Sequence, residues 1–124
     1  MSTPKPTILA IDDSRTMRSM LNAALTTAGF DVVLGEDGID GLERLNTITP
    51  DAVITDINMP RLDGFGVIEG VRNHDRHGTI PVLVLTTESA DDLKLRAKLA
   101  GATGWIVKPF DQTKLVGALR KLIA

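Results

Sequence analysis

The sequence predicts a doubly wound α/β domain, in which helices cover both faces of a five-stranded parallel sheet of order 2-1-3-4-5. The first observation is that four short apolar runs each end in a polar residue: Ile8–Ile11, Ala52–Thr55, Val82–Leu85 and Trp105–Val107. Short apolar runs between turn and helix signals are typical of buried parallel strands. The second observation is that a segment with helical periodicity or helix-start signals follows each run. Five such alternations require right-handed crossovers between parallel strands.

Each strand is expected to lead into a helix that begins at a short polar residue. Such side chains accept hydrogen bonds from the free N–H groups of a first helical turn. The residues expected to begin the five helices are Ser14, Asp37, Asp63, Asp91 and Asp111. The second strand is expected at Val32–Leu34 and the fourth at Ile80–Leu85. Gly29 and Gly101 are suitable stops for the first and fourth helices.

Two predictions concern which side chains are buried. The first helix carries apolar residues at helical spacing, which predicts one buried face made of Met17, Met20, Leu21, Ala24, Leu25 and Ala28. Residues 73–79 are expected to form a polar loop. Its histidines, His74 and His77, are interpreted as surface side chains, because no further metal ligand accompanies them.

Composition limits the class of protein. A chain of 124 residues with 43% hydrophobic and 24% charged residues fits one globular domain. No apolar run approaches the ~20 residues of a membrane span, and no long apolar segment follows Met1–Thr7, so neither membrane insertion nor a signal peptide is expected. The absence of cysteine excludes disulfides and fits a reducing cytoplasm, where we expect the protein to be located.

Charge is unevenly distributed along the chain. The net charge of −2 argues against general affinity for nucleic acid. Residues 1–90 hold 7 basic and 13 acidic residues, whereas residues 91–124 hold 7 and 3. The final third could steer an acidic partner toward itself, or its charges could simply be solvated helix faces. Its candidate docking residues are Lys94, Arg96, Lys98, Lys114, Arg120 and Lys121.

Three carboxylates are expected at the carboxyl ends of neighbouring strands. Asp12 and Asp13 follow the first strand and Asp56 follows the third, so all three lie where open α/β sheets place their ligands. Like charges this close raise one another's pKa unless a cation joins them, and Mg²⁺ prefers such oxygen ligands. A single aspartate here would be an ordinary turn or cap residue. The coincidence of three favours a Mg²⁺ site.

Two further polar side chains are expected at the same edge of the sheet. Lys108 follows the fifth strand and supplies a compact positive charge, suited to a phosphoryl oxygen or to the carboxylate of Asp56. Thr86 ends the fourth strand and supplies a hydroxyl donor. Together with the carboxylates they predict a site for Mg²⁺ and a phosphoryl group.

These residues resemble the signature of two-component receiver domains. The segment Asp56-Ile57-Asn58-Met59-Pro60-Arg61-Leu62-Asp63-Gly64 is similar to the family's phosphoacceptor motif. The Asp12-Asp13 pair, Thr86 and the Lys108-Pro109 dipeptide match its other signature positions in order and spacing. The match covers the whole chain and implies a flavodoxin-like (βα)5 fold. Among receivers, a stand-alone domain of this length resembles the CheY-type chemotaxis response regulators.

The resemblance implies roles for these residues. Asp56 accepts a phosphoryl group from the phosphohistidine of a histidine kinase. Asp13, Asp56 and the main-chain carbonyl of Asn58 bind Mg²⁺, and Asp12 binds it directly or through water. Lys108 and Thr86 contact the phosphoryl oxygens, and movement of Thr86 reshapes the loop after the fourth strand. Pro109 is expected to follow a cis peptide bond.

The chain departs from the family pattern at two positions. Trp105 stands where receivers of this kind usually carry tyrosine or another aromatic residue that moves inward on activation. Indole is bulkier than phenol and donates only through its N–H. Trp105 is therefore either a switch residue with altered behaviour or a partly buried core side chain. Thr87 replaces a residue that is commonly small, and it narrows access to the acyl phosphate.

The resemblance leads to three hypotheses about function. The first is one receiver domain over residues 1–124, monomeric and without an effector domain, that is not an enzyme but promotes its own phosphorylation and dephosphorylation. Its partners are a histidine kinase and a flagellar motor switch protein, and its output is flagellar rotation in chemotaxis. The second is a phosphate sink or phosphorelay intermediate with the same site. The third, a Mg²⁺-dependent phosphatase, is disfavoured because Asn58 occupies the position of that enzyme class's general acid.

Overall fold

The computed structural model describes residues 5–124, in which five strands alternate with five helices. The strands are β1 (Thr7–Ile11), β2 (Asp31–Gly35), β3 (Ala52–Thr55), β4 (Val82–Thr86) and β5 (Gly104–Val107). The helices are α1 (Arg15–Thr27), α2 (Gly38–Leu45), α3 (Gly64–Arg72), α4 (Asp91–Ala100) and α5 (Gln112–Ile123). The expectation of no signal peptide concerns residues 1–7, of which the first four lie outside the described residues.

The strands form one parallel sheet in the order β2-β1-β3-β4-β5, which confirms the predicted topology. Ile11 at the end of β1 pairs with Thr55 at the end of β3, and Thr86 at the end of β4 pairs with Val107 of β5. The carboxyl ends of these four strands therefore meet at one edge of the sheet. The direction of winding reverses between β1 and β3, and open α/β sheets bind their ligands at that point.

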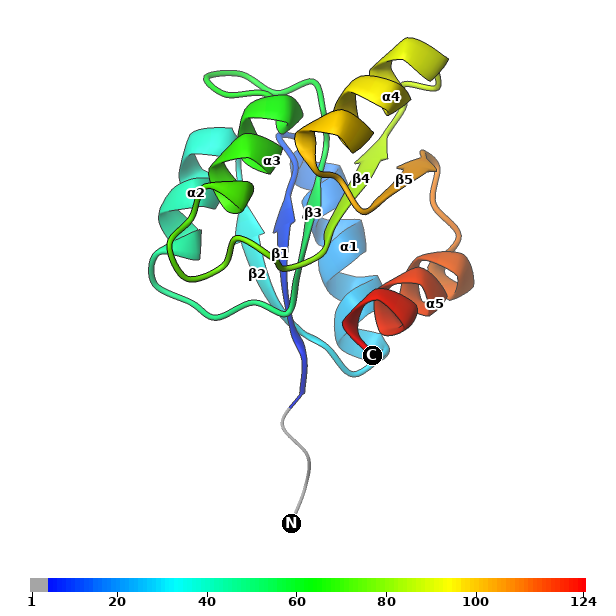
Figure 1. Cartoon of the computed structure of the whole chain (residues 1–124). Coiled ribbons are helices and arrows are strands. Elements are labelled where there is room, and N and C mark those ends of the chain that lie inside the picture. Colours follow the sequence, from blue (N-terminus) through cyan, green and yellow to red (C-terminus); the bar gives the residue numbers. More distant parts are fainter. Residues whose placement is uncertain (1–4) are drawn as a thin grey trace.

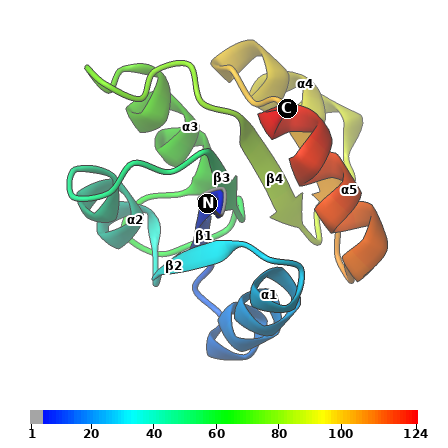
Figure 2. The ribbon, with the colours of Figure 1, turned by 90° about the horizontal axis from the view of Figure 1, so that it is seen from below.

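Each face of the sheet is covered by its own group of helices. Helices α2, α3 and α4 lie over one face, and α1 and α5 lie over the other (Figures 1 and 2). Successive side chains of β1 point to opposite faces. Leu9 and Ile11 join the core beneath α2, α3 and α4, whereas Ile8 and Ala10 join the core beneath α1 and α5. Burial on both faces explains why the strands are continuously apolar.

Four helices begin with the side-chain caps that the sequence predicts. The backbone N–H groups of Met17, Asp40, Gly66 and Lys114 donate to the side chains of Ser14, Asp37, Asp63 and Asp111, respectively. Helix α4 begins at Asp91 as expected, but its N-cap position is Ala90, which offers no side-chain acceptor. The expected glycine stops have the left-handed backbone that favours this residue, with φ of 96° at Gly29 and 112° at Gly101.

Two predictions about buried side chains were wrong. Met20 is 47% exposed, because the buried face of α1 is narrower than the apolar pattern suggests. His77 is only 6% exposed, and its ring stacks on that of His74 with centroids 4.8 Å apart. His74 Nε2 lies 3.0 Å from the side-chain oxygen of Asn46, at the end of α2. The loop over residues 73–79 therefore folds back against α2, which buries His77 and partly buries His74.

The remaining backbone expectation is confirmed, since the peptide bond between Lys108 and Pro109 is cis. It lies directly after β5, beside the edge of the sheet at which the carboxyl ends of the strands meet. Among the described residues, no helix combines the length and the apolar character that a membrane span needs.

Candidate functional site

The three predicted aspartates come together at the carboxyl ends of β1 and β3. Asp12, Asp13 and Asp56 each offer a carboxylate oxygen, and these oxygens lie within 4.8 Å of one another. Asp12 and Asp56 are buried, with 1% and 8% exposure, while Asp13 is exposed. Two buried carboxylates and a third, exposed one therefore form an acidic cluster that solvent reaches at Asp13.

Both carboxylate oxygens of Asp12 and its main-chain carbonyl accept hydrogen bonds. The backbone N–H of Ser14 donates to Asp12 Oδ1 at 2.9 Å, and Lys108 Nζ donates to Asp12 Oδ2 at 2.8 Å. Its main-chain carbonyl accepts a hydrogen bond from Arg18 Nη1 at 2.8 Å. Sequence reasoning missed Arg18, although it follows the cap residue Ser14 by four positions and therefore lies on the same side of α1.

The two carboxylate oxygens of Asp56 accept hydrogen bonds from different donors, one from the backbone and one from a cation. The backbone N–H of Ile57 donates to Asp56 Oδ1 at 2.6 Å, and Lys108 Nζ donates to Asp56 Oδ2 at 2.8 Å. Helix α3 begins close by, because the backbone of Gly64 packs so tightly against the Asp56 carbonyl that no Cβ fits there. The orientation of the Asp56 carboxylate is thus fixed by the loop that follows β3.

Lys108 is the counter-charge of the cluster. Its ammonium bridges the carboxylates of Asp12 and Asp56, and its side chain is only 10% exposed. Burial alone would lower the pKa of Lys108, but the hydrogen bonds and charges of the two carboxylates outweigh it, so the pKa is raised. Lys108 therefore stays protonated at neutral pH, and one positive charge faces three carboxylates.

A chain of hydrogen bonds links the end of β4 to β5 through Glu88. The backbone N–H of Glu88 donates to the buried Thr86 hydroxyl at 3.4 Å. The indole N–H of Trp105 donates to the Glu88 main-chain carbonyl at 3.1 Å. The side-chain amide of Asn58 donates to Glu88 Oε1 at 2.9 Å. Glu88 is therefore the common contact of Thr86, Asn58 and Trp105.

Comparison with known proteins identifies the family. The family model "Response regulator receiver domain" matches residues 8–120. The chain belongs to this family. Receiver domains accept a phosphoryl group in two-component signalling, with a histidine kinase as the donor.

Solved receivers share the fold at high coverage. The Vibrio cholerae chemotaxis protein CheY4 superimposes with a TM-score of 0.92 at 36% identity, covering 96% of this chain and 99% of that one. The receiver domain of the Pseudomonas aeruginosa sensor histidine kinase PA1611 superimposes with a TM-score of 0.89 at 25% identity, covering 97% and 98%. The PA1611 structure contains a magnesium ion coordinated in its active-site cleft.

Larger proteins also contain a segment similar to this chain. Transcriptional regulatory protein PrrA of Mycobacterium tuberculosis is 36% identical over 118 residues, which is 95% of this chain. The chain spans only 50% of the length of PrrA. The match to PrrA therefore concerns the receiver part of that regulator.

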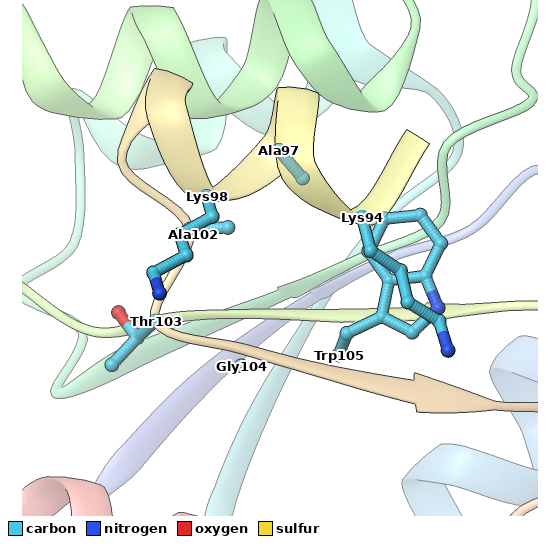
Figure 3. A pocket seen from close by; sticks show the side chains of 7 residues that line it. All are labelled: Lys94, Ala97, Lys98, Ala102, Thr103, Gly104 and Trp105. Atoms are coloured by element: carbon cyan, nitrogen blue, oxygen red, sulfur yellow. The ribbon is translucent and has the colours of Figure 1, made fainter. Parts of the chain in front are cut away.

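A pocket of about 340 Å³ lies beside the Trp105 end of this receiver's hydrogen-bond chain. Helix α4 contributes Lys94, Ala97 and Lys98, and β5 contributes Gly104 and Trp105 (Figure 3). The indole lies beside Lys94 at one end of the pocket, and Lys98 lies at the other (Figure 3). The pocket therefore combines an apolar floor and an aromatic wall with two positive charges.

Proposed function

We propose that the chain is a phosphorylation-activated signalling switch that accepts a phosphoryl group on Asp56. The observation that carries this proposal is the Asp56 carboxylate itself, which is fixed by Ile57, paired with Lys108 and adjacent to two further carboxylates. A carboxylate oxygen of Asp56 forms a bond to phosphorus while the phosphorus–nitrogen bond of the phosphohistidine breaks. The electron pair of that bond returns to the imidazole nitrogen of the kinase.

The donor set fits Mg²⁺, because among the described residues one protein cation, Lys108, forms ion pairs with this cluster of three carboxylates. Asp12, Asp13 and Asp56 would hold the ion, with the main-chain carbonyl of Asn58 completing the protein ligands. When bound, Mg²⁺ neutralises charge on the carboxylates and on the phosphoryl oxygens. The magnesium ion in the PA1611 receiver supports this assignment.

Lys108 and Thr86 would recognise the phosphoryl group. Lys108 already lies against Asp56 Oδ2, from which its ammonium can donate to a phosphoryl oxygen. Within residues 5–124 the Thr86 hydroxyl accepts one long bond, from the Glu88 N–H at 3.4 Å, so it can reorient toward a phosphoryl oxygen at little cost. That movement would release the backbone of Glu88, to which Trp105 is bonded, and would thereby change the pocket between α4 and β5.

The output would be binding of a partner at this pocket. Lys94 and Lys98 favour an acidic segment, and the indole and apolar floor favour an apolar side chain within it. We propose a flagellar motor switch protein as the partner, with flagellar rotation in chemotaxis as the outcome, because the Vibrio cholerae chemotaxis protein is similar over nearly its whole length. In this proposal the receiver acts as a monomer, is not an enzyme, and promotes its own phosphorylation and dephosphorylation.

Labelling by a phosphorylated histidine kinase tests the phosphoacceptor. The expected result is Mg²⁺-dependent labelling of the wild type and none of Asp56→Asn. Asp31→Asn is the matched control, since Asp31 is an exposed aspartate at the start of β2. Strong residual labelling of Asp56→Asn would remove Asp56 from this role.

Retention of a motor switch protein on immobilised receiver tests the output. The phosphoryl mimic beryllofluoride is expected to promote retention in the wild type, and Lys94→Glu is expected to weaken it. Lys5→Glu is the control, since Lys5 is an exposed lysine ahead of β1 that does not line the pocket. Phosphorylation without any retention would favour the phosphate sink or relay instead.

A further inference from the structure

A second ion pair joins the loop after β3 to the start of α2. Arg61 Nε donates to Asp37 Oδ2 at 2.7 Å, and Arg61 Nη2 donates to Asp37 Oδ1 at 3.0 Å. Two parallel hydrogen bonds between a guanidinium and a carboxylate fix the relative orientation of both planar groups. Asp37 is itself immobile, because it is 8% exposed and caps α2 through the N–H of Asp40 at 2.9 Å.

Arg61 needs such an anchor, because its backbone is strained. It has a φ of 66° and is the one residue other than glycine with positive φ between residues 5 and 124. A left-handed residue with a Cβ costs about 1–2 kcal/mol, and it persists only where its surroundings hold it. The pair with Asp37 provides that restraint, and the N–H of Leu62 closes a tight turn onto the carbonyl of Pro60 at 2.7 Å.

The loop is held at both ends, with Asn58 between them. At one end Gly64 packs against the Asp56 carbonyl, and its N–H donates to the carbonyl of Ile57 at 2.9 Å. At the other end the backbone of Gly38, at the start of α2, packs against the Leu62 carbonyl with no room for a Cβ. The span from Asn58 to Pro60 is therefore positioned by contacts on both sides of it.

We propose that Arg61 is a positioning residue for the cation site: through Asp37 it sets the loop backbone so that the Asn58 carbonyl is held toward the carboxylates. This inference rests on the proposed Mg²⁺-dependent function. Arg61 does not contact the ion. Its guanidinium is paired with Asp37 at 2.7 Å.

Calorimetric titration of the metal-free protein with MgCl₂ tests the inference. At position 61, asparagine tolerates the left-handed backbone but cannot form the two parallel hydrogen bonds to Asp37. At position 37, asparagine can still cap α2. Arg61→Asn and Asp37→Asn are each expected to raise the Kd for Mg²⁺ about tenfold, as loss of an orienting partner typically does. The double variant should bind no more weakly than either single variant, because both remove the same pair.

The controls separate positioning from general stability. Arg44→Asn removes the 3.6 Å ion pair with Asp40 on α2 without touching the loop, and it should leave the Kd unchanged. Arg61→Lys keeps the charge and one hydrogen bond, and its Kd should be intermediate. If Arg61→Asn lowers the urea midpoint but binds Mg²⁺ with the wild-type Kd, the inference is overturned. In that case, loss of Mg²⁺ binding in Asp13→Ala would still leave the proposed function standing. Absence of Mg²⁺ binding in the wild type would overturn both.

Discussion

The loops that leave the neighbouring strands β3 and β4 reach the same edge of the sheet but are held in different ways. The β3–α3 loop, residues 56–63, is fixed by backbone packing at Gly64 and by the Arg61–Asp37 pair. The β4–α4 loop, residues 87–90, is held by three hydrogen bonds of Glu88: a long one to Thr86, and those that it accepts from the side chains of Asn58 and Trp105. Helix α4 then begins without a side-chain cap.

This difference separates the two tasks that the proposed function needs. A loop that supplies a ligand must keep its geometry, because a small displacement weakens every contact at the site. A loop that signals must have a second arrangement of similar free energy, which exchangeable side-chain hydrogen bonds allow. The β3–α3 loop fits the first requirement, and the β4–α4 loop fits the second.

The largest effect is expected from disturbing the rigid loop at Gly64. In Gly64→Ala the new Cβ collides with the Asp56 carbonyl and lies 2.8 Å from the Ile57 Cα, both backbone atoms that cannot rotate away. We expect the free energy of unfolding to fall by about 3 kcal/mol in urea denaturation. Gly117→Ala is the control, because a Cβ there meets nothing within 4 Å and should stabilise α5 by about 0.5–1 kcal/mol. Equal behaviour of the two variants would show that the loop is not rigid.

A smaller effect is expected from loosening the other loop at Trp105. Trp105→Phe keeps an aromatic ring but removes the indole N–H that donates to the Glu88 carbonyl. The loss should cost about 1 kcal/mol of unfolding free energy. Hydrogen exchange should become faster at the amides of residues 87–90 and stay unchanged at residues 57–62. Uniform acceleration in both loops would contradict the distinction between them.

The same loop can be stiffened from the start of α4. Ala90→Ser supplies the missing N-cap acceptor, and it should raise the free energy of unfolding by about 0.5–1 kcal/mol. Hydrogen exchange at residues 87–90 should become slower, opposite in direction to the effect of Trp105→Phe. Faster exchange in this variant would indicate that the N-cap position does not limit the motion of the loop.

The smallest effect is expected from lowering the pH, which weakens the Arg61–Asp37 pair that holds the rigid loop. The hydrogen bond from Arg61, followed by that from the N–H of Asp40, holds the pKa of Asp37 below its ordinary value of 3.8. A carboxylate whose pKa is depressed by folding stabilises the protein above the ordinary pKa, and this stabilisation is lost as pH falls through the folded pKa.

The urea stability of wild type and Asp37→Asn should therefore differ by a constant amount at neutral pH. The difference should begin to shrink as pH falls through the ordinary pKa of 3.8, and it should vanish only below the lowered folded pKa, where Asp37 is protonated in both states. A difference that persists unchanged in strong acid would show that the charge on Asp37 is not what Arg61 recognises.

The alternation of strands and helices and the residues of the acidic cluster could be predicted because local patterns determine them, whereas the order 2-1-3-4-5 is one of the common orders of doubly wound sheets. Doubly buried strands are continuously apolar, and the polar residue after each strand must lie at the carboxyl edge. The convergence of Asp12, Asp56 and Lys108 therefore follows from the position of each residue in its own strand. Their chemical roles remain predictions that the labelling and titration experiments address.

The contacts that were missed depend on segments that no local pattern relates. Asp37 and Arg61 are 24 residues apart, and the left-handed backbone of Arg61 has no signature in an arginine. The burial of His77 depends on how its loop folds back against α2. The exposure of Met20 depends on how much of α1 the neighbouring elements cover. Each of these is a property of the packing of distant elements.

The NMR resonance of the Trp105 indole N–H offers the most direct test of the account, because the chain has one tryptophan and the signal is unambiguous. Addition of Mg²⁺ and beryllofluoride should shift this resonance in the wild type, since in the proposed mechanism a ligand on Asp56 draws Thr86 away from Glu88, whose main-chain carbonyl accepts from the indole. Asp56→Asn should show no shift. An unmoved resonance in the wild type, or the same shift in Asp56→Asn, would contradict the coupling between Asp56 and the pocket at Trp105.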